Sequence, residues 1–381
     1  MHGQATESNV IGVQAGAPNP SLVSDSVEAS MRRRSVRLPA TVRSYADEMQ
    51  CAWDDYVQRH PSGSLFHLTA WKRVIEKAFR FEARYLFVEQ MGIIRGVLPL
   101  FLVRNFFFGS SLISTPLAVY GGVCADDEQT ADRLRGVACE IATRERVQYL
   151  ELREQSRTPG SKFQTKELYV SFDLDLPSDP SQLINLFPRD TRYMIRKGVK
   201  HGLEAAVDNS ELSTFYEVYS RSYHNLGTPV FSKRLFRTIL DEFGRECELL
   251  TVWQNKKALA SVLSFRFRDW ILPYFGGSLV EGRALAVNNF MYYEVMRRAA
   301  ESGLRHFDFG RSKKDSGSYA FKTHWNMRER PLPYQFFLVR RKDVPNLSPA
   351  NPKFKLAISL WKALPFPVTK MLGPAMVRSF T

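Results

Sequence analysis

Two long stretches of the chain repeat one order of hydrophobic and polar positions. The first reads RYLFVEQMGIIRGVLPLFLVRNFFFGSSLISTPLAVYGGVC, followed by TADRLRGVACEIATRERV and then QYLELRE. The second reads ELLTVWQNKKALASVLSFRFRDWILPYFGGSLV, followed by NNFMYYEVMRRAAESGL and then RHFDFGRS. Each pattern predicts a strand, a turn, a long strand, a turn, a strand that ends in Gly-Gly, a helix and a final strand. The repeat distance of roughly 160 residues indicates a duplicated domain rather than a solenoid.

The repeated pattern predicts an α+β fold with two tandem domains. In each domain we expect a mixed, mostly antiparallel sheet flanked by helices, because antiparallel strands precede a helix and another strand follows it. A length of 381 residues agrees with two domains. We place the N-terminal domain at residues 41–175 and the C-terminal domain at residues 176–345.

The two ends of the chain read differently from the repeats. Residues 1–40 lack the basic start and apolar run of a signal peptide and predict a disordered leader. Residues 346–381 predict a basic amphipathic tail, because no acid follows Asp343 while five cations mix with apolar side chains. Such a tail suits an anionic membrane surface or a helix pair packed on the domain, and the sequence leaves both open.

Charge and cysteine content narrow the function classes. The formal charge of +14 favours an anionic partner, which can be a phosphate-bearing substrate, a nucleic acid or an acidic membrane face. The four cysteines are far apart with no CxxC, so we expect reduced, mostly buried thiols, no structural zinc and a cytoplasmic protein. No P-loop, GxSxG or HExxH motif occurs, so nucleotide hydrolysis and metal catalysis have no support and we predict no metal site.

A basic helix is predicted between the two halves. Pro188 can open it, and glycines at 198 and 202 can help to close it. The cations Arg189, Arg192, Arg196 and Lys200 recur every three or four residues and form one stripe, with Met194, Ile195 and Val199 on the other side. No acid between Thr191 and Gly202 is available to pair with these cations. The stripe is either a solvated charged face or an anion-binding surface.

The segment HFDFGRSKKDSGSYAFKTHWN, residues 306–326, holds the candidate catalytic groups. In a strand, Phe307 and Phe309 face the core while Asp308 faces the other way, onto a polar or cleft-lining surface. After the loop RSKKDSGS, a second short element brings Tyr319, Lys322 and His324 near Asp308. A lysine beside a cleft can stabilise an oxyanion, and a carboxylate or tyrosine can move a proton. A salt-bridged hairpin is the alternative.

The order of these features resembles the FemAB family of tandem acyltransferase-fold proteins. It also resembles the BioF2-like relatives of that family and those associated with exosortase (PEP-CTERM) and exopolysaccharide systems. The similarity is carried by SLFHLTAWKRVIEKAF, RDTRYMIRKGVKHGLE, FYEVYSRSYHNLGTPVFSKRLFRTIL, ALAVNNFMYYEVMRRAAESGLRHFDFGRS and YAFKTHWN, which span residues 44–345. It implies two GNAT-like domains packed together, with the reaction in a cleft of the second and a non-catalytic copy in the first.

The resemblance also implies roles for individual residues. Lys322 corresponds to the lysine that steadies the tetrahedral oxyanion, and Asp308 to the acidic strand end. Arg192, Arg196 and Lys197 correspond to a basic helix motif that faces phosphates of the acceptor or of tRNA. We include Tyr319 among the catalytic candidates, and assign Arg189, Lys200 and Arg311 to the substrate- or phosphate-binding residues.

We therefore expect an N-acyl- or aminoacyltransferase that acts on an amine of a cell-envelope glycan, peptidoglycan or exopolysaccharide precursor, free or lipid-linked. The donor stays open between acyl-CoA and aminoacyl-tRNA as co-substrates, with no tightly bound cofactor. The chain has neither the coiled-coil arm that some FemAB proteins insert nor the coenzyme A pyrophosphate loop of ordinary GNAT enzymes. The alternatives are a non-catalytic polyanion- or RNA-binding protein and a membrane-associated accessory protein of polysaccharide biosynthesis. We expect a cytoplasmic location, with a peripheral position on the inner membrane left open.

Overall fold

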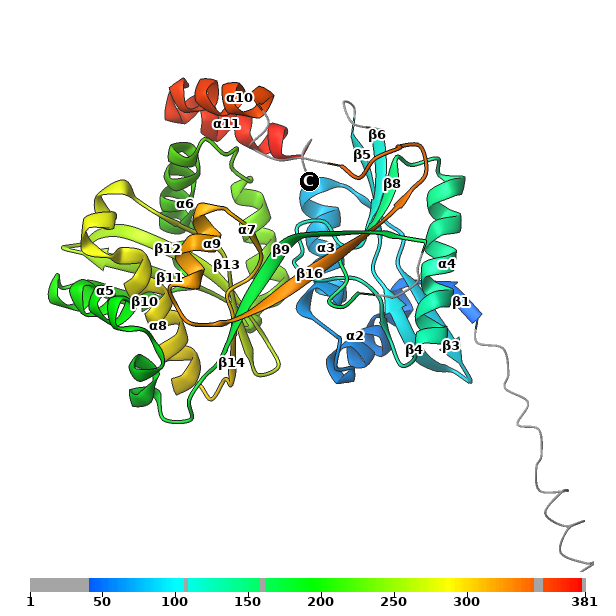
Figure 1. Ribbon diagram of the computed structural model, residues 1–381, viewed down its shortest axis with the longest axis horizontal. Coiled ribbons are helices and arrows are strands. Elements are labelled where there is room, and N and C mark those ends of the chain that lie inside the picture. The colour runs from blue at the N-terminus through cyan, green and yellow to red at the C-terminus, as the bar shows by residue number, and fades with distance from the viewer. Residues whose placement is uncertain (1–40, 106–108, 158–161, 346–351, 379–381) are drawn as a thin grey trace, which may run out of the picture. The chain divides into compact units, whose positions relative to one another are not determined.

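The two copies of the sequence pattern form similar sets of strands and helices (Figure 1). The computed structural model describes residues 41–105, 109–157, 162–345 and 352–378, with only the backbone of α10 described for 352–357. The expected leader and the start of the tail, residues 346–351, lie outside these ranges. Within the described residues, the mixed, mostly antiparallel α+β class expected from the sequence is confirmed.

The first half contains nine strands and three α-helices among its described residues. The strands are β1 (Thr41–Ser44), β2 (Glu82–Ala83), β3 (Leu86–Gln90), β4 (Ile93–Leu98), β5 (Phe101–Asn105), β6 (Gly109–Ile113), β7 (Cys124–Ala125), β8 (Tyr149–Leu152) and β9 (Gln164–Asp175). The helices are α2 (Gln50–Arg59), α3 (Thr69–Phe79) and α4 (Glu128–Arg144).

The second half contains a similar succession of strands and helices with additional helices, and the tail adds two more helices. The strands are β10 (Glu204–Val207), β11 (Cys247–Gln254), β12 (Lys257–Phe267), β13 (Trp270–Ser278), β14 (His306–Asp308), β15 (Ser312–Lys313) and β16 (Arg328–Leu338). The helices are α5 (Arg189–Lys200), α6 (Leu212–Leu226), α7 (Lys233–Phe243), α8 (Val287–Glu301), α9 (Gly317–Thr323), α10 (Pro352–Ala363) and α11 (Phe366–Val377).

Each half contains a parallel strand pair joined by a helix. In the first half, β6 and β8 are parallel and α4 connects them; in the second, β13 and β14 are parallel and α8 connects them. The other strand pairs of the described sheets are antiparallel. The helices predicted before the final strand of each repeat are thus confirmed as α4 and α8.

The first copy departs from its predicted strands at two places. The expected long strand is broken at Pro99 into β4 and β5, which belong to different sheets. Proline has no backbone N–H and therefore interrupts a strand ladder. The expected strand end at Gly121-Gly122 is also wrong, because β6 ends at Ile113 and a loop follows. In the second copy the Gly-Gly pair does lie in β13, as predicted.

The two halves share one sheet because their last strands are exchanged. Strand β9 pairs with β14 of the second half, where Asp173 lies opposite Asp308. Strand β16 pairs with β8 of the first half, where Phe337 lies opposite Leu150. The two strands also pair with each other and cross the centre of the molecule in Figure 1. The described strands thus form a twelve-stranded sheet and a separate four-stranded one. The domain division at residue 175 stays a prediction, and strand pairing runs across it.

Aromatic packing joins the halves on one side of this sheet. Helix α3 contacts α7, and the fully buried Trp71 of α3 meets the rings of Phe243, Phe265 and Tyr274 at centroid distances of 5.7 to 6.1 Å. These residues belong to one hydrophobic cluster drawn from both halves. Burial of large aromatic side chains contributes strongly to stability, so this packing and the exchanged strands both hold the halves together.

Helix α5 begins at Arg189, directly after Pro188, as the sequence predicts. It packs on α8 through Gly198, where an added Cβ would lie only 2.8 Å from the Cβ of Phe290. Ile195 is buried as expected, but Val199 is 58% exposed, which corrects its assignment to an apolar inner side. The close approach at Gly198 turns Val199 outward.

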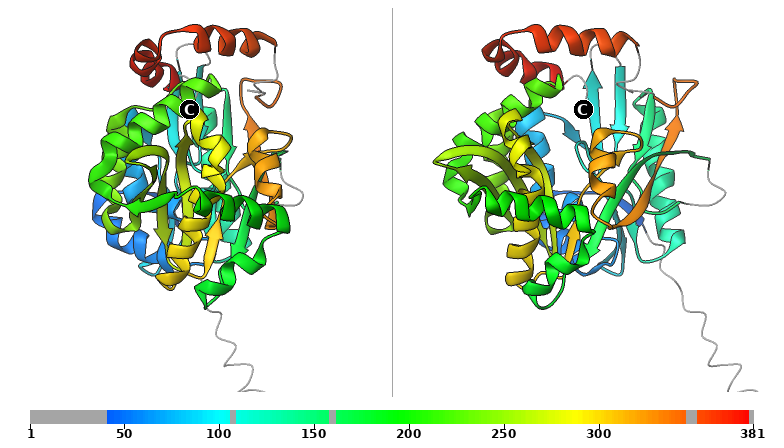
Figure 2. Two further views of the ribbon diagram at one scale, coloured as in Figure 1. Left: turned by 90° about the vertical axis from the view of Figure 1, so that its left-hand side faces the viewer. Right: turned by 60° about the vertical axis from the view of Figure 1, so that its left-hand side comes forward.

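The tail helices α10 and α11 contact α6 and lie beyond its end in Figures 1 and 2. Trp361 is 6% exposed, the Nζ of Lys370 donates to Glu217 at 2.6 Å, and His224 Nδ1 lies 3.0 Å from Thr369 Oγ1. One side of the tail is therefore packed on the domain. Among the described residues no helix combines the length and apolar character needed to cross a membrane.

Candidate active site at the end of strand β14

Asp308 lies at the end of β14, between the buried rings of Phe307 and Phe309. The predicted alternation is therefore confirmed: both phenylalanines enter the core, and the carboxylate points to the other face. Asp308 is only 5% exposed, and burial raises the pKa of its carboxyl group. A buried carboxylate needs hydrogen bonds to stay ionised.

Three donors surround the Asp308 carboxylate. Ser171 Oγ donates to Oδ1 at 2.6 Å, the Gly310 backbone N–H donates to Oδ1 at 2.8 Å, and Tyr120 OH donates to Oδ2 at 2.6 Å. Burial raises the pKa of Tyr120 well above its ordinary value, so its hydroxyl remains a donor. The three hydrogen bonds work against burial and lower the pKa of Asp308 in part.

Lys322 approaches the same backbone segment from α9. Lys322 is 8% exposed, and its Nζ donates to the carbonyl oxygens of Phe309 at 2.5 Å and Gly310 at 2.9 Å. Burial lowers the pKa of Lys322 to about 8, while the negative charge of Asp308 acts in the opposite direction. Two of its three N–H donors are thus occupied, which leaves one for another acceptor.

The second short element of the sequence prediction is the helix α9, so the segment does not form the simple hairpin of the alternative. Ser316 caps it, because its Oγ accepts a hydrogen bond from the Tyr319 backbone N–H at 3.2 Å. The loop before it is fixed in part by β15, which pairs with β9. The helical turn between Ser316 and Lys322 directs the lysine inward.

The other candidates from this segment are placed differently. Tyr319 does not meet Asp308: its hydroxyl donates to Glu329 Oε2 at 3.0 Å, and its ring packs beside Phe172. Arg311 is half-buried, with its guanidinium 4.7 Å from the centroid of the Tyr169 ring and a 3.3 Å hydrogen bond to Tyr334 OH. The structure therefore groups Asp308 with Lys322 and separates Tyr319 from them.

The basic helix stands apart from Asp308. Within the described residues, no ion pair or side-chain hydrogen bond is found for the five candidate cations of α5. These cations are Arg189, Arg192, Arg196, Lys197 and Lys200. None of them lines the cavity at Asp308. The helix is tied to the segment after α9, since Thr191 Oγ1 donates to the His324 carbonyl at 2.6 Å. The predicted stripe thus exists as an unpaired cationic surface on α5.

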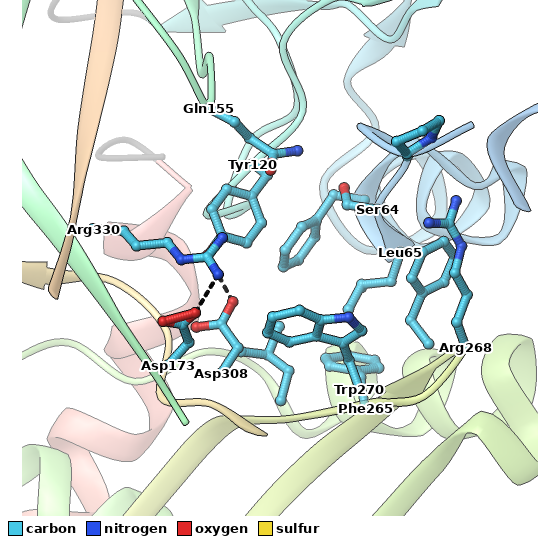
Figure 3. A pocket seen from close by; sticks show the side chains of 15 residues that line it. Ser64, Leu65, Tyr120, Gln155, Asp173, Phe265, Arg268, Trp270, Asp308 and Arg330 are labelled. Atoms are coloured by element: carbon cyan, nitrogen blue, oxygen red, sulfur yellow. Dashed lines mark hydrogen bonds and ion pairs between the residues drawn. The ribbon is translucent and has the colours of Figure 1, made fainter. Parts of the chain in front are cut away.

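A cavity opens at Asp308 between the two halves (Figure 3). Its empty space is about 770 Å³ when the open solvent at its mouth is included. Side chains that face it in Figure 3 are Ser64, Leu65, Tyr120 and Gln155 from the first half, Phe265, Arg268, Trp270 and Asp308 from the second, and Asp173 and Arg330 from the exchanged strands. Lys322 is not among the lining residues.

A second acid lies beside Asp308 in this cavity. Asp173 is 3% exposed and accepts hydrogen bonds from Arg328 Nε at 2.8 Å and Nη2 at 2.9 Å, and it also forms an ion pair with Arg330. Two cations therefore neutralise Asp173, whereas the hydrogen bonds to Asp308 come from neutral donors. Of these two acids, Asp308 is accordingly the one suited to accept a proton.

Several of these residues have no signal in the sequence. Tyr120 is 188 positions from Asp308, and Ser171 is 137 positions from it. Asp173 and Arg330 meet only because β9 and β16 pair. No local motif could have identified them, since strand exchange between the halves brings them together.

Comparisons with known proteins support the fold. Residues 187–323 match the family model of the acetyltransferase (GNAT) domain, a stretch that contains α5, β14 and Lys322. A search of curated proteins found no match. The chain thus carries a GNAT-type domain in its second half.

Solved structures extend the likeness to both halves. The crystal structure of FemX is 18% identical with a TM-score of 0.61, covering 79% of this chain and 98% of FemX. The C-terminal domain of a putative lysylphosphatidylglycerol synthetase from Agrobacterium fabrum is 13% identical with a TM-score of 0.52, covering 83% and 95%. A tandem GNAT protein from the clavulanic acid biosynthesis pathway is 10% identical with a TM-score of 0.50, covering 80% and 100%. At these identities the likeness concerns the fold, and it confirms the expected GNAT-like architecture.

Proposed function

We propose that this protein is an acyltransferase that moves an acyl or aminoacyl group onto an amine of a cell-envelope glycan, peptidoglycan or exopolysaccharide precursor. The observation that carries the proposal is Asp308, a buried carboxylate with a raised pKa that lines the cavity between the two halves. The GNAT match over residues 187–323 and the FemX-like fold support this class of reaction.

The proposed reaction joins an amine to an activated carbonyl. The amine nitrogen attacks the carbonyl carbon of a thioester or ester, the C–N bond forms, and the C–S or C–O bond breaks. The attacking amine loses a proton to the Asp308 carboxylate, and the leaving thiolate or alkoxide takes up that proton, which returns Asp308 to its ionised form. Such chemistry needs positioning, a proton acceptor and charge stabilisation, and no covalent intermediate on the protein.

Lys322 is proposed to stabilise the negative charge that develops on the carbonyl oxygen. Its ammonium group is enclosed in low-dielectric surroundings, where its charge acts more strongly than in water. Because Lys322 does not line the cavity, the proposal assigns it the effect of its charge from behind the Gly310 backbone rather than a hydrogen bond to the oxyanion. Tyr319 has no role in the proposal, because its hydroxyl is bonded to Glu329.

The α5 cations are proposed to bind phosphates of the donor or acceptor. Coenzyme A, tRNA and nucleotide- or lipid-linked precursors all carry them, and unpaired arginines suit phosphate oxygens. A fold neighbour named as a putative lysylphosphatidylglycerol synthetase supports aminoacyl transfer as one version of the reaction. The donor stays open between acyl-CoA and aminoacyl-tRNA.

The test offers both donors separately. The purified protein is incubated with envelope-precursor extracts and radiolabelled aminoacyl-tRNA in one reaction, and with radiolabelled acyl-CoA in another. Label that enters the glycan or lipid-extractable fraction from one donor supports the proposal and identifies the donor. Absence of transfer from either donor, under conditions where a known acyl- or aminoacyltransferase transfers its own substrate, contradicts it.

A second candidate function is non-catalytic binding of RNA or another polyanion. The unpaired cations of α5 favour it, together with the formal charge of +14. It predicts binding that weakens steeply with salt and shows no base preference. Polyanion binding without any group transfer would favour this candidate over the enzyme.

A further inference from the structure

Helix α11 has apolar side chains on the side that packs and on the side that does not. Its buried residues are Thr369, Gly373 and Val377, which recur every four residues. The intervening positions include Met371, which is 72% exposed, and Leu372, which is 41% exposed. A helix on the surface of a soluble domain normally carries polar or charged residues on its outer side.

The outer side of α11 lacks such residues. Its exposed positions are Pro367, Met371, Leu372, Ala375 and Met376. Lys370 is the one charged residue of the helix, and it is held by Glu217 on α6. Nothing in the sequence of α11 therefore makes its outer side favourable in water.

Exposed apolar residues also occur at the end of α10 and directly after it. Leu360 is 61% exposed and Leu364 is 36% exposed, while Trp361 between them is buried. Together, Leu360, Leu364, Met371, Leu372 and Met376 are called the tail surface below. They are five of the thirteen large hydrophobic side chains that are exposed in the described residues, so exposed apolar groups concentrate in these two short helices and the link between them.

The charge of the tail indicates what covers this surface. From residue 344 to the end, the chain has no acid and five cations, which are Lys353, Lys355, Lys362, Lys370 and Arg378. Among those with described side chains, Lys362 and Arg378 are exposed beside the apolar positions. A second copy docked through the same surface would bring like charges together across a two-fold interface. The partner must therefore bury apolar side chains and also attract cations, and a partner surface that is both apolar and negatively charged does so.

We propose that the tail surface docks onto an anionic lipid bilayer. Helices α10 and α11 lie in the headgroup region, with the five apolar side chains entering the acyl boundary and the exposed Lys362 contacting lipid phosphates. The packed side of the tail stays on α6, so attachment needs no unfolding of the domain. This inference concerns attachment and holds whichever group the enzyme transfers.

Vesicle co-sedimentation of the full chain tests the proposal. We expect the protein to sediment with phosphatidylcholine vesicles that contain phosphatidylglycerol, to bind pure phosphatidylcholine vesicles at least about tenfold more weakly, and to be released in part by salt. The variant Met371→Glu/Leu372→Glu/Met376→Glu is expected to bind the anionic vesicles at least about tenfold more weakly.

The matched control is Met91→Glu/Ile93→Glu, which changes two hydrophobic residues that are 68% and 54% exposed at the β3–β4 turn. It is expected to bind like the wild type. Circular dichroism and thermal melting verify that each variant is folded, and Leu360→Glu/Leu364→Glu replaces the triple variant if that one unfolds. The variants change exposed side chains, so the fold is expected to survive.

Three results overturn the proposal. The first is equal sedimentation of the wild type and the folded tail variants, and the second is no binding of the wild type to anionic vesicles. The third is a concentration-dependent dimer in light scattering that the tail variants abolish, which would make a second copy the occupant. A failure of acyl transfer leaves the vesicle result intact, so the two proposals fail separately.

Discussion

Asp308 and Lys322 hold the same residue, Gly310, through the two polar groups of its backbone. The Gly310 N–H donates to Asp308 Oδ1 at 2.8 Å, and Lys322 Nζ donates to the Gly310 carbonyl at 2.9 Å. Gly310 adopts a φ of +69°, a left-handed conformation that suits glycine. The proposed proton acceptor and the proposed oxyanion-stabilising cation are thereby fixed relative to each other by one residue.

Replacing Lys322 by alanine tests the cation directly. We expect turnover to fall by about 10²- to 10³-fold, because one preorganised charge is removed from the transition state. Turnover and KM are measured for the labelled donor, and a loss confined to turnover indicates a transition-state role. Lys342→Ala, an exposed lysine, serves as the control and should leave both constants unchanged. Full activity in a folded Lys322→Ala protein would rule out the assignment.

The pH profile of turnover should be bell-shaped. Asp308 accepts a proton only when it is ionised, so activity should fall as pH drops through its raised pKa. Lys322 acts only when protonated, so activity should also fall as pH rises through its pKa of about 8. The variant Lys322→Arg keeps its charge at higher pH and should move the alkaline limb upward. An alkaline limb that stays in place in an active Lys322→Arg enzyme argues against the lysine as its source.

The α5 cations should act on binding rather than chemistry. We expect Arg192→Ala/Arg196→Ala to raise KM for the phosphate-bearing substrate by about tenfold and to flatten its salt dependence, with turnover nearly unchanged. Arg234→Ala/Arg237→Ala removes two exposed arginines from one face of α7 and is the matched control. If both double variants have the same effect, the α5 stripe is a solvated charged face.

Trp71 should be important for the junction between the halves. Its ring is fully buried against aromatic residues of the second half, so Trp71→Ala is expected to lower the free energy of unfolding by about 3 to 5 kcal/mol. Denaturant unfolding followed by circular dichroism measures the change. A loss below about 1 kcal/mol would mean that the exchanged strands alone hold the halves together.

Local patterns in the sequence predicted the elements that depend on nearby residues. The helices α4, α5 and α8 and the strand β14 follow from hydrophobic spacing and from Pro188, and the burial of Phe307 and Phe309 follows from strand alternation. Three of the four cysteines are buried and free, as expected from their spacing, while Cys51 is exposed.

Features that depend on distant residues were not predictable in this way. The exchange of β9 and β16 brings Asp173 and Arg330 into the cavity, and no periodicity marks it. The short segment around Lys322 is a helix because the Ser316 side chain caps its first turn. Its hydrophobic and polar positions alone do not indicate a helix. The hydrogen bond from Tyr120 to Asp308 was equally hidden, because only the tertiary contact between the halves brings this tyrosine to the carboxylate.

The most direct test of the central claim compares the wild type with Asp308→Asn in the labelled transfer reaction. Asparagine has nearly the same shape but cannot accept the proton, so the account predicts transfer by the wild type from one donor and a loss of about 10²- to 10⁴-fold in the folded variant. Transfer that is undiminished in folded Asp308→Asn would contradict the claim that this carboxylate carries the chemistry.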